Sequence, residues 1–404
     1  MTKTTFSVLI ASLLTLQACS FYPSPKTDEP LNHHRIVLDA GSSKTKLYFY
    51  QYDTQGKQAP QHIETLLEKK QTPGLAAIPL NEINDYLSGL FTKELASQLQ
   101  QLSHTEQGDA ANSLLEQIQV YSTAGMRLIS NADRQAKNQA VSEWIAQWLV
   151  NNHIEFDDEN LDVRTISGAE EGAYAWAAFN YVEDNFTRQT SGIVELGGAS
   201  MQITFLDQQH NNITISVGGK SYALSSESHM LGQDLIAKKL SKLDVCQLSG
   251  SNDTAKGNFA MCHHQAVKLI EKEPKLTLRH AANIHNYGLL SNFYYTAQFF
   301  DLESQYSLSQ LASKASQFCS LSWQSAQTQY SEVNKAYLAN YCMAAAYQTA
   351  ILDEGYHLTD KQKFTPINES STLEVSWPVG VLLTQDYQQR SDYVARINQP
   401  NTQQ

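Results

Sequence analysis

Residues 192–205 combine a carboxylate, a glycine turn and two polar side chains in a pattern that suits phosphate chemistry. The stretch reads GIVELGGASMQITF, in which Glu195 ends an apolar run and Gly197–Gly198 form a turn. Ser200 and Gln202 then alternate with apolar residues, which predicts a strand, a tight turn and a second strand. Glycine lets the turn approach a ligand and aim its N–H groups at phosphate oxygens, and the carboxylate can hold a hydrated cation. An ordinary hairpin has the same local pattern, so this stretch alone leaves both interpretations open.

An approximate copy of this pattern occurs near the start of the chain. Residues 35–50 read RIVLDAGSSKTKLYFY, with Asp39 at the end of an apolar strand and a small-residue turn at 41–43. A repeated phosphate-turn hairpin predicts two related lobes that face each other across a cleft.

Two further polar groups follow short predicted strands. Thr123 and Arg127 come after a strand at 116–122, where small residues lead into a helix with a basic first turn. Glu170 and Glu171 open a helix after a second short strand. Acidic residues in a first helical turn are often only partners of the helix dipole, but a carboxylate held at a cleft can also act as a general base towards water.

The remaining elements follow from periodicity. We expect helices at 132–151, 284–300, 308–318 and 335–352, a helical region beginning at 225, and an alternating pattern at 372–383. The helix at 335–352 carries a tyrosine stripe, which is usually core, although one tyrosine at the cleft end could stack on a base.

The N-terminus indicates export. Residues 1–18 fit a signal peptide, because the apolar stretch is too short to span a membrane, and residues 19–32 fit a tether. The segment ending at Cys19 resembles a bacterial lipobox, which would make the protein an outer-membrane lipoprotein; plain secretion, periplasmic or extracellular, is the alternative. The four other cysteines suggest two disulfides with three possible connectivities, of which sequence neighbours are the simplest: Cys246–Cys262 and Cys319–Cys342.

Composition limits the partners. The formal net charge of −12 gives no support for nucleic-acid binding, and no other segment is apolar enough to cross a membrane. We therefore expect a monomer whose only membrane contact is a lipid on Cys19. The chain of 404 residues is long for one hydrophobic core and predicts two domains.

Together the motifs resemble the five apyrase-conserved regions of the nucleoside triphosphate diphosphohydrolases, the ecto-apyrase family. The resemblance spans roughly residues 36–383 and rests on their order: Asp39-Ala-Gly-Ser-Ser43, Thr123-Ala-Gly-Met-Arg127, Gly168-x-Glu-Glu-Gly172, Leu196-Gly-Gly-Ala-Ser-x-Gln202 and Trp377-Pro-x-Gly380. It implies an α/β fold of two actin-like (ribonuclease-H-like) lobes, each a mixed sheet flanked by helices, with the nucleotide in the cleft between them. We expect lobe I at 33–162, lobe II at 163–370 and a return segment to lobe I at 371–404.

The resemblance also implies residue roles for an exported nucleotidase that hydrolyses terminal phosphates of nucleoside tri- and diphosphates. Glu171 corresponds to the catalytic base, and Ser200 and Gln202 would help to hold the attacking water. Asp39 and Glu195 would bind waters around a divalent cation (Mg, Ca or Mn), with Trp377 near that hydrated metal. The phosphates would lie against Gly41, Ser42, Ser43, Lys44, Thr123, Ala124, Gly197, Gly198 and Ala199, and the base would stack on Tyr347; Arg127 would pair within the cleft floor.

The chemistry is coherent without the family name, because water attack on a phosphate needs a base, a cation and fixed donors. No Walker lysine motif is present, so the two turns must form the cradle, and we expect direct attack by water. Two positions depart from the family. Glu195 stands where aspartate is usual, which puts the metal preference in doubt, and Lys44 stands where histidine or a small polar residue is common.

Two other functions remain open. One is hydrolysis of polyphosphate or an alarmone by the same superfamily, and the other is nucleotide binding without turnover. The retained Glu171, Ser200 and Gln202 favour turnover.

Overall fold

The computed structural model describes residues 31–54, 59–104, 115–272, 276, 279–370 and 373–384. The predicted signal peptide, the lipid site at Cys19 and nearly all of the predicted tether lie outside the described residues. None of the helices that the structure describes is long and apolar enough to cross a membrane.

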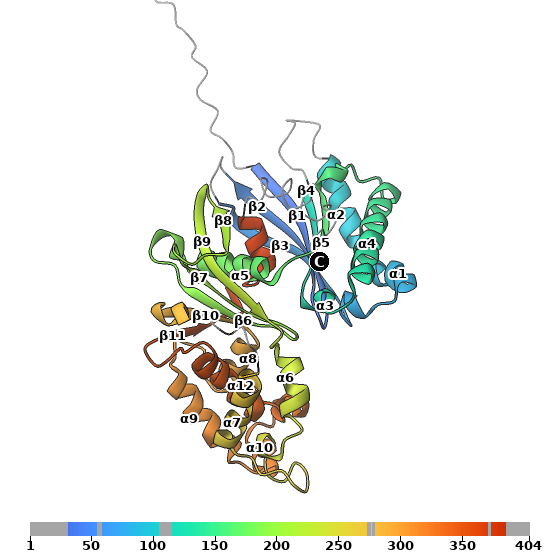
Figure 1. The fold of residues 1–404 in the computed structure, drawn as a ribbon. Helices are drawn as coiled ribbons and strands as arrows, with labels where there is room; N and C mark the ends of the chain where they lie inside the picture. The colour runs from blue at the N-terminus through green and yellow to red at the C-terminus, as the bar shows by residue number, and fades with distance from the viewer. Residues whose placement is uncertain are drawn as a thin grey trace, which may run out of the picture. The chain divides into compact units, whose positions relative to one another are not determined.

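Two mixed β-sheets organise the described chain (Figure 1). The five-stranded sheet has the order β3-β2-β1-β4-β5, and the six-stranded sheet has the order β11-β10-β6-β7-β9-β8. The strands of the first sheet are β1 (Leu31–Ala40), β2 (Thr45–Thr54), β3 (Gln61–Gln71), β4 (Leu115–Ser122) and β5 (Leu161–Thr165). Those of the second are β6 (Gly192–Leu196), β7 (Met201–Leu206), β8 (Ile213–Val217), β9 (Lys220–His229), β10 (Asn286–Ser291) and β11 (Lys363–Pro366), and β12 (Glu369–Ser370) and β13 (Leu373–Glu374) form a separate ribbon.

The repeated sequence pattern forms the same hairpin in each sheet. In the first sheet β1 pairs antiparallel with β2 up to Ala40 and Thr45, and parallel with β4 on its other side. In the second sheet β6 pairs antiparallel with β7 up to Leu196 and Met201, and parallel with β10. The apolar residues of both central strands, 36–38 in β1 and 193–194 in β6, are fully buried, as expected for strands covered on two faces.

Helices flank both sheets, which confirms the predicted fold class. They are α1 (Ile83–Ser88), α2 (Lys93–His104), α3 (Ala124–Arg127), α4 (Asn131–Asn151), α5 (Gly168–Val182), α6 (Gln233–Leu240), α7 (Phe259–Ile270), α8 (Asn292–Phe299), α9 (Leu308–Cys319), α10 (Trp323–Gln329), α11 (Lys335–Leu338), α12 (Tyr341–Ala350), which continues into a π-helical turn at Ile351–Gly355, and α13 (Trp377–Leu383).

The helices α5 and α13 pack against each other and share one hydrophobic core with both sheets. Tyr48 and Tyr50 of the first sheet belong to this core, as do Ile193 and Leu224 of the second. A Cβ atom at Gly380 of α13 would lie 1.8 Å from the carbonyl oxygen of Tyr174, so the two helices cross with the backbones in near contact. This packing fixes the segment that carries Glu171.

Three predicted elements differ from the structure. The region predicted as helical from residue 225 is still strand β9 as far as His229, and α6 starts only at Gln233. The predicted helix at 284–300 is strand β10 followed by α8, because the apolar run Tyr287–Leu290 completes the buried sheet beside β6. The alternating pattern at 372–383 becomes helix α13 from Trp377, with a proline in its first turn where no backbone N–H is needed.

β5 pairs with β4 inside the first sheet, so the predicted boundary at residue 163 falls within a strand of that sheet. The division into lobes and a return segment stays a prediction.

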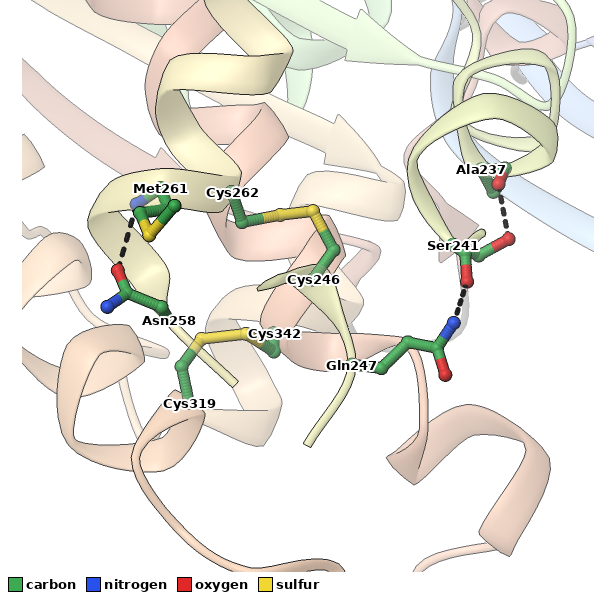
Figure 2. The surroundings of a disulfide bond; sticks show 9 residues. All are labelled: Ala237, Ser241, Cys246, Gln247, Asn258, Met261, Cys262, Cys319 and Cys342. Carbon is green, nitrogen blue, oxygen red and sulfur yellow. Dashed lines mark hydrogen bonds between the residues drawn. A yellow bond between two sulfur atoms is a disulfide. The ribbon is translucent and has the colours of Figure 1, made fainter. Parts of the chain in front are cut away.

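Two disulfides link helical segments that lie between β9 and β11 in the chain (Figure 2). Cys246 bonds to Cys262 of α7, and Cys319 at the end of α9 bonds to Cys342 of α12. The structure therefore pairs these cysteines as sequence neighbours, which is the simplest of the three predicted connectivities.

Candidate active site

Both glycine turns open into one cavity of about 710 Å³, a size that suits a nucleotide. The cavity is lined by fourteen of the residues predicted from the sequence: Asp39, Gly41, Ser42, Ser43, Lys44, Thr123, Ala124, Glu171, Glu195, Gly197, Gly198, Ala199, Ser200 and Trp377. Because these residues come from both sheets and from helices α3, α5 and α13, only the tertiary fold brings them together.

The two glutamates at the start of α5 have different partners. Glu170 forms a capping box with Ser167: its carboxylate accepts the Ser167 N–H at 2.7 Å, and it also pairs with Arg164 at 2.6 Å. Glu171 is buried and lines the cavity. The helix-capping interpretation therefore fits Glu170, and Glu171 is left available for chemistry.

The Glu171 carboxylate is held by two side chains from different elements. Its Oε2 atom accepts a hydrogen bond from Nη2 of Arg127 at 2.8 Å and from Nε2 of Gln202 at 3.1 Å. Burial raises the pKa of Glu171, and the Arg127 guanidinium opposes this shift. Arg127 also donates to the Ile166 carbonyl oxygen at 3.0 Å and to Ser200 Oγ at 3.2 Å, and its role in the cleft floor stays a prediction.

Gln202 occupies a different place from the one predicted. It is almost completely buried and does not line the cavity, whereas Ser200 does. Its Nε2 atom donates to Ser200 Oγ at 2.8 Å and to Ser228 Oγ at 3.1 Å, as well as to Glu171. Gln202 therefore positions the Glu171 carboxylate and the Ser200 hydroxyl without lining the cavity itself. Ser228 of β9 was not found from the sequence, since its only signal there is one small polar residue in a serine-rich strand.

Asp39 and Glu195 end the central strands of the two sheets and present free oxygens to the cavity. Asp39 Oδ1 and Glu195 Oε2 are buried without a hydrogen-bond partner, and the other Glu195 oxygen accepts from Ser291 Oγ at 3.2 Å. Burial and the Glu171 charge raise the pKa of Asp39 to about 7, and burial, Glu171 and Asp39 raise the pKa of Glu195 to about 8.

The charge set fits a hydrated divalent cation. A cation would compensate two carboxylates that each keep a buried, unpartnered oxygen, and oxygen ligands suit magnesium, calcium and manganese. No cluster of three or more histidine, cysteine or carboxylate side chains able to bind a metal occurs among the described residues. Water would therefore have to supply most of the ligands, as predicted for Asp39 and Glu195.

Glycines outside the two turns make room for the first turn. A Cβ at Gly74 would lie 2.3 Å from the Gly41 carbonyl oxygen, and one at Gly125 would lie 2.9 Å from Ser42 Cα. A Cβ at Gly198 would lie 3.1 Å from Ser42 Oγ, so the two turns meet at Ser42. Gly74 was not found from the sequence, because nothing near it in the chain shows what it packs against.

The base-stacking role predicted for Tyr347 does not fit the structure. Tyr347 is fully buried, its hydroxyl donates to the Leu231 carbonyl oxygen, and it does not line the cavity. The cavity meets only the first turns of α12, so Tyr341 is presented there and Tyr347 lies in the core. Tyr295 and Tyr337, which are 48% and 68% exposed, also line the cavity and supply the accessible aromatic faces.

Fold and site together define an α/β protein of the actin-like class, in which paired glycine turns face a cavity that holds a buried glutamate and two carboxylates. The model of the GDA1/CD39 (nucleoside phosphatase) family matches residues 26–235 and 236–398. The chain belongs to this family.

Relatives and a solved structure agree with this assignment. The chain is 27% identical to ectonucleoside triphosphate diphosphohydrolase 1 of Bos taurus, over 86% of this chain and 80% of the relative. It is 27% identical to probable apyrase 3 of Arabidopsis thaliana, over 89% and 84% of the two chains. A nucleoside triphosphate hydrolase structure from Neospora caninum superimposes with a TM-score of 0.59 at 15% identity, covering 88% of this chain and 92% of the other, which shows the shared fold. The protein is thus an enzyme of the nucleoside triphosphate diphosphohydrolase (apyrase) type, which hydrolyses nucleoside phosphates.

Proposed function

We propose that the protein is an exported nucleotidase that removes the terminal phosphate of nucleoside tri- and diphosphates by direct attack of water, with Glu171 as the general base. The observation that supports this proposal is the hydrogen-bonded group in which buried Gln202 donates to both Glu171 and Ser200, the two members that line the cavity.

The base needs an oxygen that can take a proton from water. Arg127 and Gln202 both donate to Oε2 of Glu171, which leaves Oε1 to accept that proton. Burial brings the carboxylate's pKa closer to neutrality, and a base poised near the working pH is most effective. Ser200 Oγ lies in the same group and lines the cavity, so it can orient the same water.

The phosphate is held by backbone donors and a polar side chain. The turns at 41–43 and 197–199 line the cavity, and Thr123 and Ala124 lie at the start of α3, the helix that carries Arg127. Water attacks the terminal phosphorus, its proton passes to Glu171, and the bond from phosphorus to the bridging oxygen breaks, which releases phosphate and the shortened nucleotide. Asp39 and Glu195 would hold a hydrated divalent cation, which when bound neutralises charge on the phosphate oxygens.

The nucleoside would extend away from Glu171 towards the tyrosines. Tyr295, Tyr337 and Tyr341 line the cavity, and stacking on such rings is largely independent of which base is bound. We therefore expect activity on several nucleotides.

Export is part of the proposal. The disulfides Cys246–Cys262 and Cys319–Cys342 form in oxidising compartments, and the N-terminal residues fit a signal peptide.

The test is phosphate release from ATP, ADP, GTP and UTP with magnesium, calcium or manganese, using the purified protein beside Glu171→Ala. We expect release from several nucleotides and a loss of about a thousandfold or more in kcat for the variant. Glu170→Ala is the matched control, because this neighbour lies in the capping box, and it should keep most of the activity. Full activity in Glu171→Ala would contradict the assignment of the base. Tight ATP binding without release would favour a binding protein, and release from polyphosphate alone would change the substrate class.

A further inference from the structure

One wall of the cavity carries three lysines from adjacent strands of the first sheet. Lys44 ends the first turn, Lys46 lies on β2, and Lys70 lies on β3 directly opposite Lys46. All three line the cavity. We call these three residues the lysine wall.

The lysines differ in how their charges are balanced. Lys46 pairs with Glu374 of β13 at 2.6 Å and with Glu68 at 3.4 Å. Lys44 and Lys70 form no ion pair or side-chain hydrogen bond with any other described residue. Lys44 is partly buried, and both burial and the two neighbouring lysines lower its pKa. Glu374 and Asp39 oppose this shift, but neither forms an ion pair with Lys44, so the ammonium groups of Lys44 and Lys70 are available to bind an anion from outside the protein.

The lysine wall lies away from the catalytic base. Glu171 contacts Arg127 of α3, which follows β4 on one side of β1. Lys46 and Lys70 lie on β2 and β3, on the other side of β1. Lys46 and Glu374 are also close enough to Tyr295 to act on it electrostatically, which places this wall towards the tyrosines.

The reacting phosphate must lie next to Glu171 whatever the length of the phosphate chain. In a diphosphate the second phosphate then lies at the glycine turns and the ribose follows it. In a triphosphate a third phosphate lies one position further from Glu171, towards the lysines. We propose that Lys44 and Lys70 bind this innermost phosphate of nucleoside triphosphates and so make the enzyme prefer triphosphates over diphosphates. This inference rests on the proposed function, because it takes Glu171 to mark the reacting end.

The experiment compares ATP with ADP for Lys44→Ser, Lys70→Gln and the double variant. Hydrogen bonds to charged groups are among the stronger ones, so we expect kcat/KM for ATP to fall about tenfold or more in each variant. In Lys70→Gln, kcat/KM for ADP should fall about twofold or less. In Lys44→Ser, which changes the residue that ends the first turn, kcat/KM for ADP should fall clearly less than kcat/KM for ATP. The matched control is Lys69→Gln, which removes the same charge from the same strand; Lys69 pairs with Glu94 at 2.7 Å and does not line the cavity. It should leave the ratio of ATP to ADP activity unchanged.

A binding measurement separates this inference from the proposed mechanism. Calorimetric titration of ATP and ADP into Glu171→Ala, with and without Lys44→Ser, reports affinity in the absence of turnover. The added substitution should weaken ATP binding about tenfold more than ADP binding. Equal losses for the two nucleotides in both assays, or the same loss in Lys69→Gln, would overturn the inference. If the proposed function itself is wrong, the result differs, because the unsubstituted enzyme would then release no phosphate from either nucleotide.

Discussion

At the scale of single residues, the site depends on how two neighbouring glutamates are divided between capping and catalysis. Glu170 closes the first turn of α5 with Ser167, and Glu171 turns into the cavity towards Arg127. Arg127 therefore does more than stabilise the cleft floor. It holds the carboxylate and keeps its pKa below the value that burial alone would produce.

Replacing Arg127 by glutamine should change the pH profile of the reaction. Without the guanidinium the pKa of Glu171 rises, so less of the base is ionised at neutral pH. We expect kcat/KM at pH 7 to fall about tenfold to a hundredfold, with partial recovery as the pH increases, and a smaller loss in Arg127→Lys. The measurement is kcat/KM against pH.

Arg164→Gln is the control for that profile, because Arg164 pairs with Glu170 and not with Glu171. Its profile should keep the midpoint of the unsubstituted enzyme. A uniform loss in Arg127→Gln at every pH would mean that the arginine only supports the structure.

At the scale of elements, the phosphate turn of the first sheet is held from outside by a loop. Gly74 follows β3 and packs on the backbone at Gly41 and Ser42, while Gly125 of α3 packs on the other side of Ser42. The turn is therefore positioned by backbone contacts that leave no space for a side chain.

Gly74→Ala should displace the turn and reduce activity. Its backbone angles are ordinary, with φ at −65°, so the effect comes from space alone. The added Cβ would lie 2.3 Å from the Gly41 carbonyl oxygen, and overpacking of this kind costs about 1–3 kcal/mol. We expect kcat/KM for ATP to fall about tenfold or more, with a lower midpoint of thermal unfolding. Ala77→Ser, an exposed change in the same loop, should leave both quantities unaltered, and wild-type kcat/KM in Gly74→Ala would contradict the role of the loop.

At the scale of the whole molecule, folding brings three carboxylates together in one cavity. Asp39 comes from the first sheet, Glu195 from the second, and Glu171 from the helix that packs in their shared core. The Glu171 charge raises the pKa of Asp39 and that of Glu195, and the Asp39 charge also raises the pKa of Glu195, because like charges in a buried site oppose ionisation.

The stability of the cation-free protein should therefore depend on pH. The folded-state pKa values of Asp39 and Glu195 are about 7 and about 8, raised above their ordinary values of 3.8 and 4.5. A group with a raised folded pKa contributes stability that is fully present below its unfolded pKa and is lost as the pH rises through its folded pKa. When a chelator has removed divalent cations, the midpoint temperature of thermal unfolding should fall by about 2 °C or more between pH 6 and pH 9.

A divalent cation should offset this loss, because it binds the ionised carboxylates and stabilises the folded state by mass action. The cation should therefore raise the midpoint more at pH 9 than at pH 6. Glu195→Gln should reduce both the pH dependence and the cation effect. A midpoint that falls equally in the variant and the unsubstituted protein would show that other groups cause the change.

Features that depend only on neighbouring residues could be predicted from the sequence alone. The order of neighbouring residues predicts the two strand–turn–strand hairpins, the glutamate pair at the start of α5 and the buried apolar strands. The family resemblance rests on the same local motifs. The sequence also indicated the simplest cysteine pairing, because each pair is close along the chain. The residues alone suggested that a carboxylate could hold a cation and that a tyrosine could stack on a base, and the resemblance then assigned these roles to particular residues.

Which of several similar residues faces the cavity depends on how the separate segments pack. Tyr347 and Tyr341 share one helix, and the depth at which α12 is buried leaves only its first turns at the cavity. Gln202 was predicted beside the water, but the packing of β7 against β9 places it behind Ser200. Ser228, Gly74 and Lys70 carry no local signal, since each acts through contacts with residues distant in the chain. Local sequence sets the conformation of a segment, but the identity of its neighbours depends on how separate segments pack.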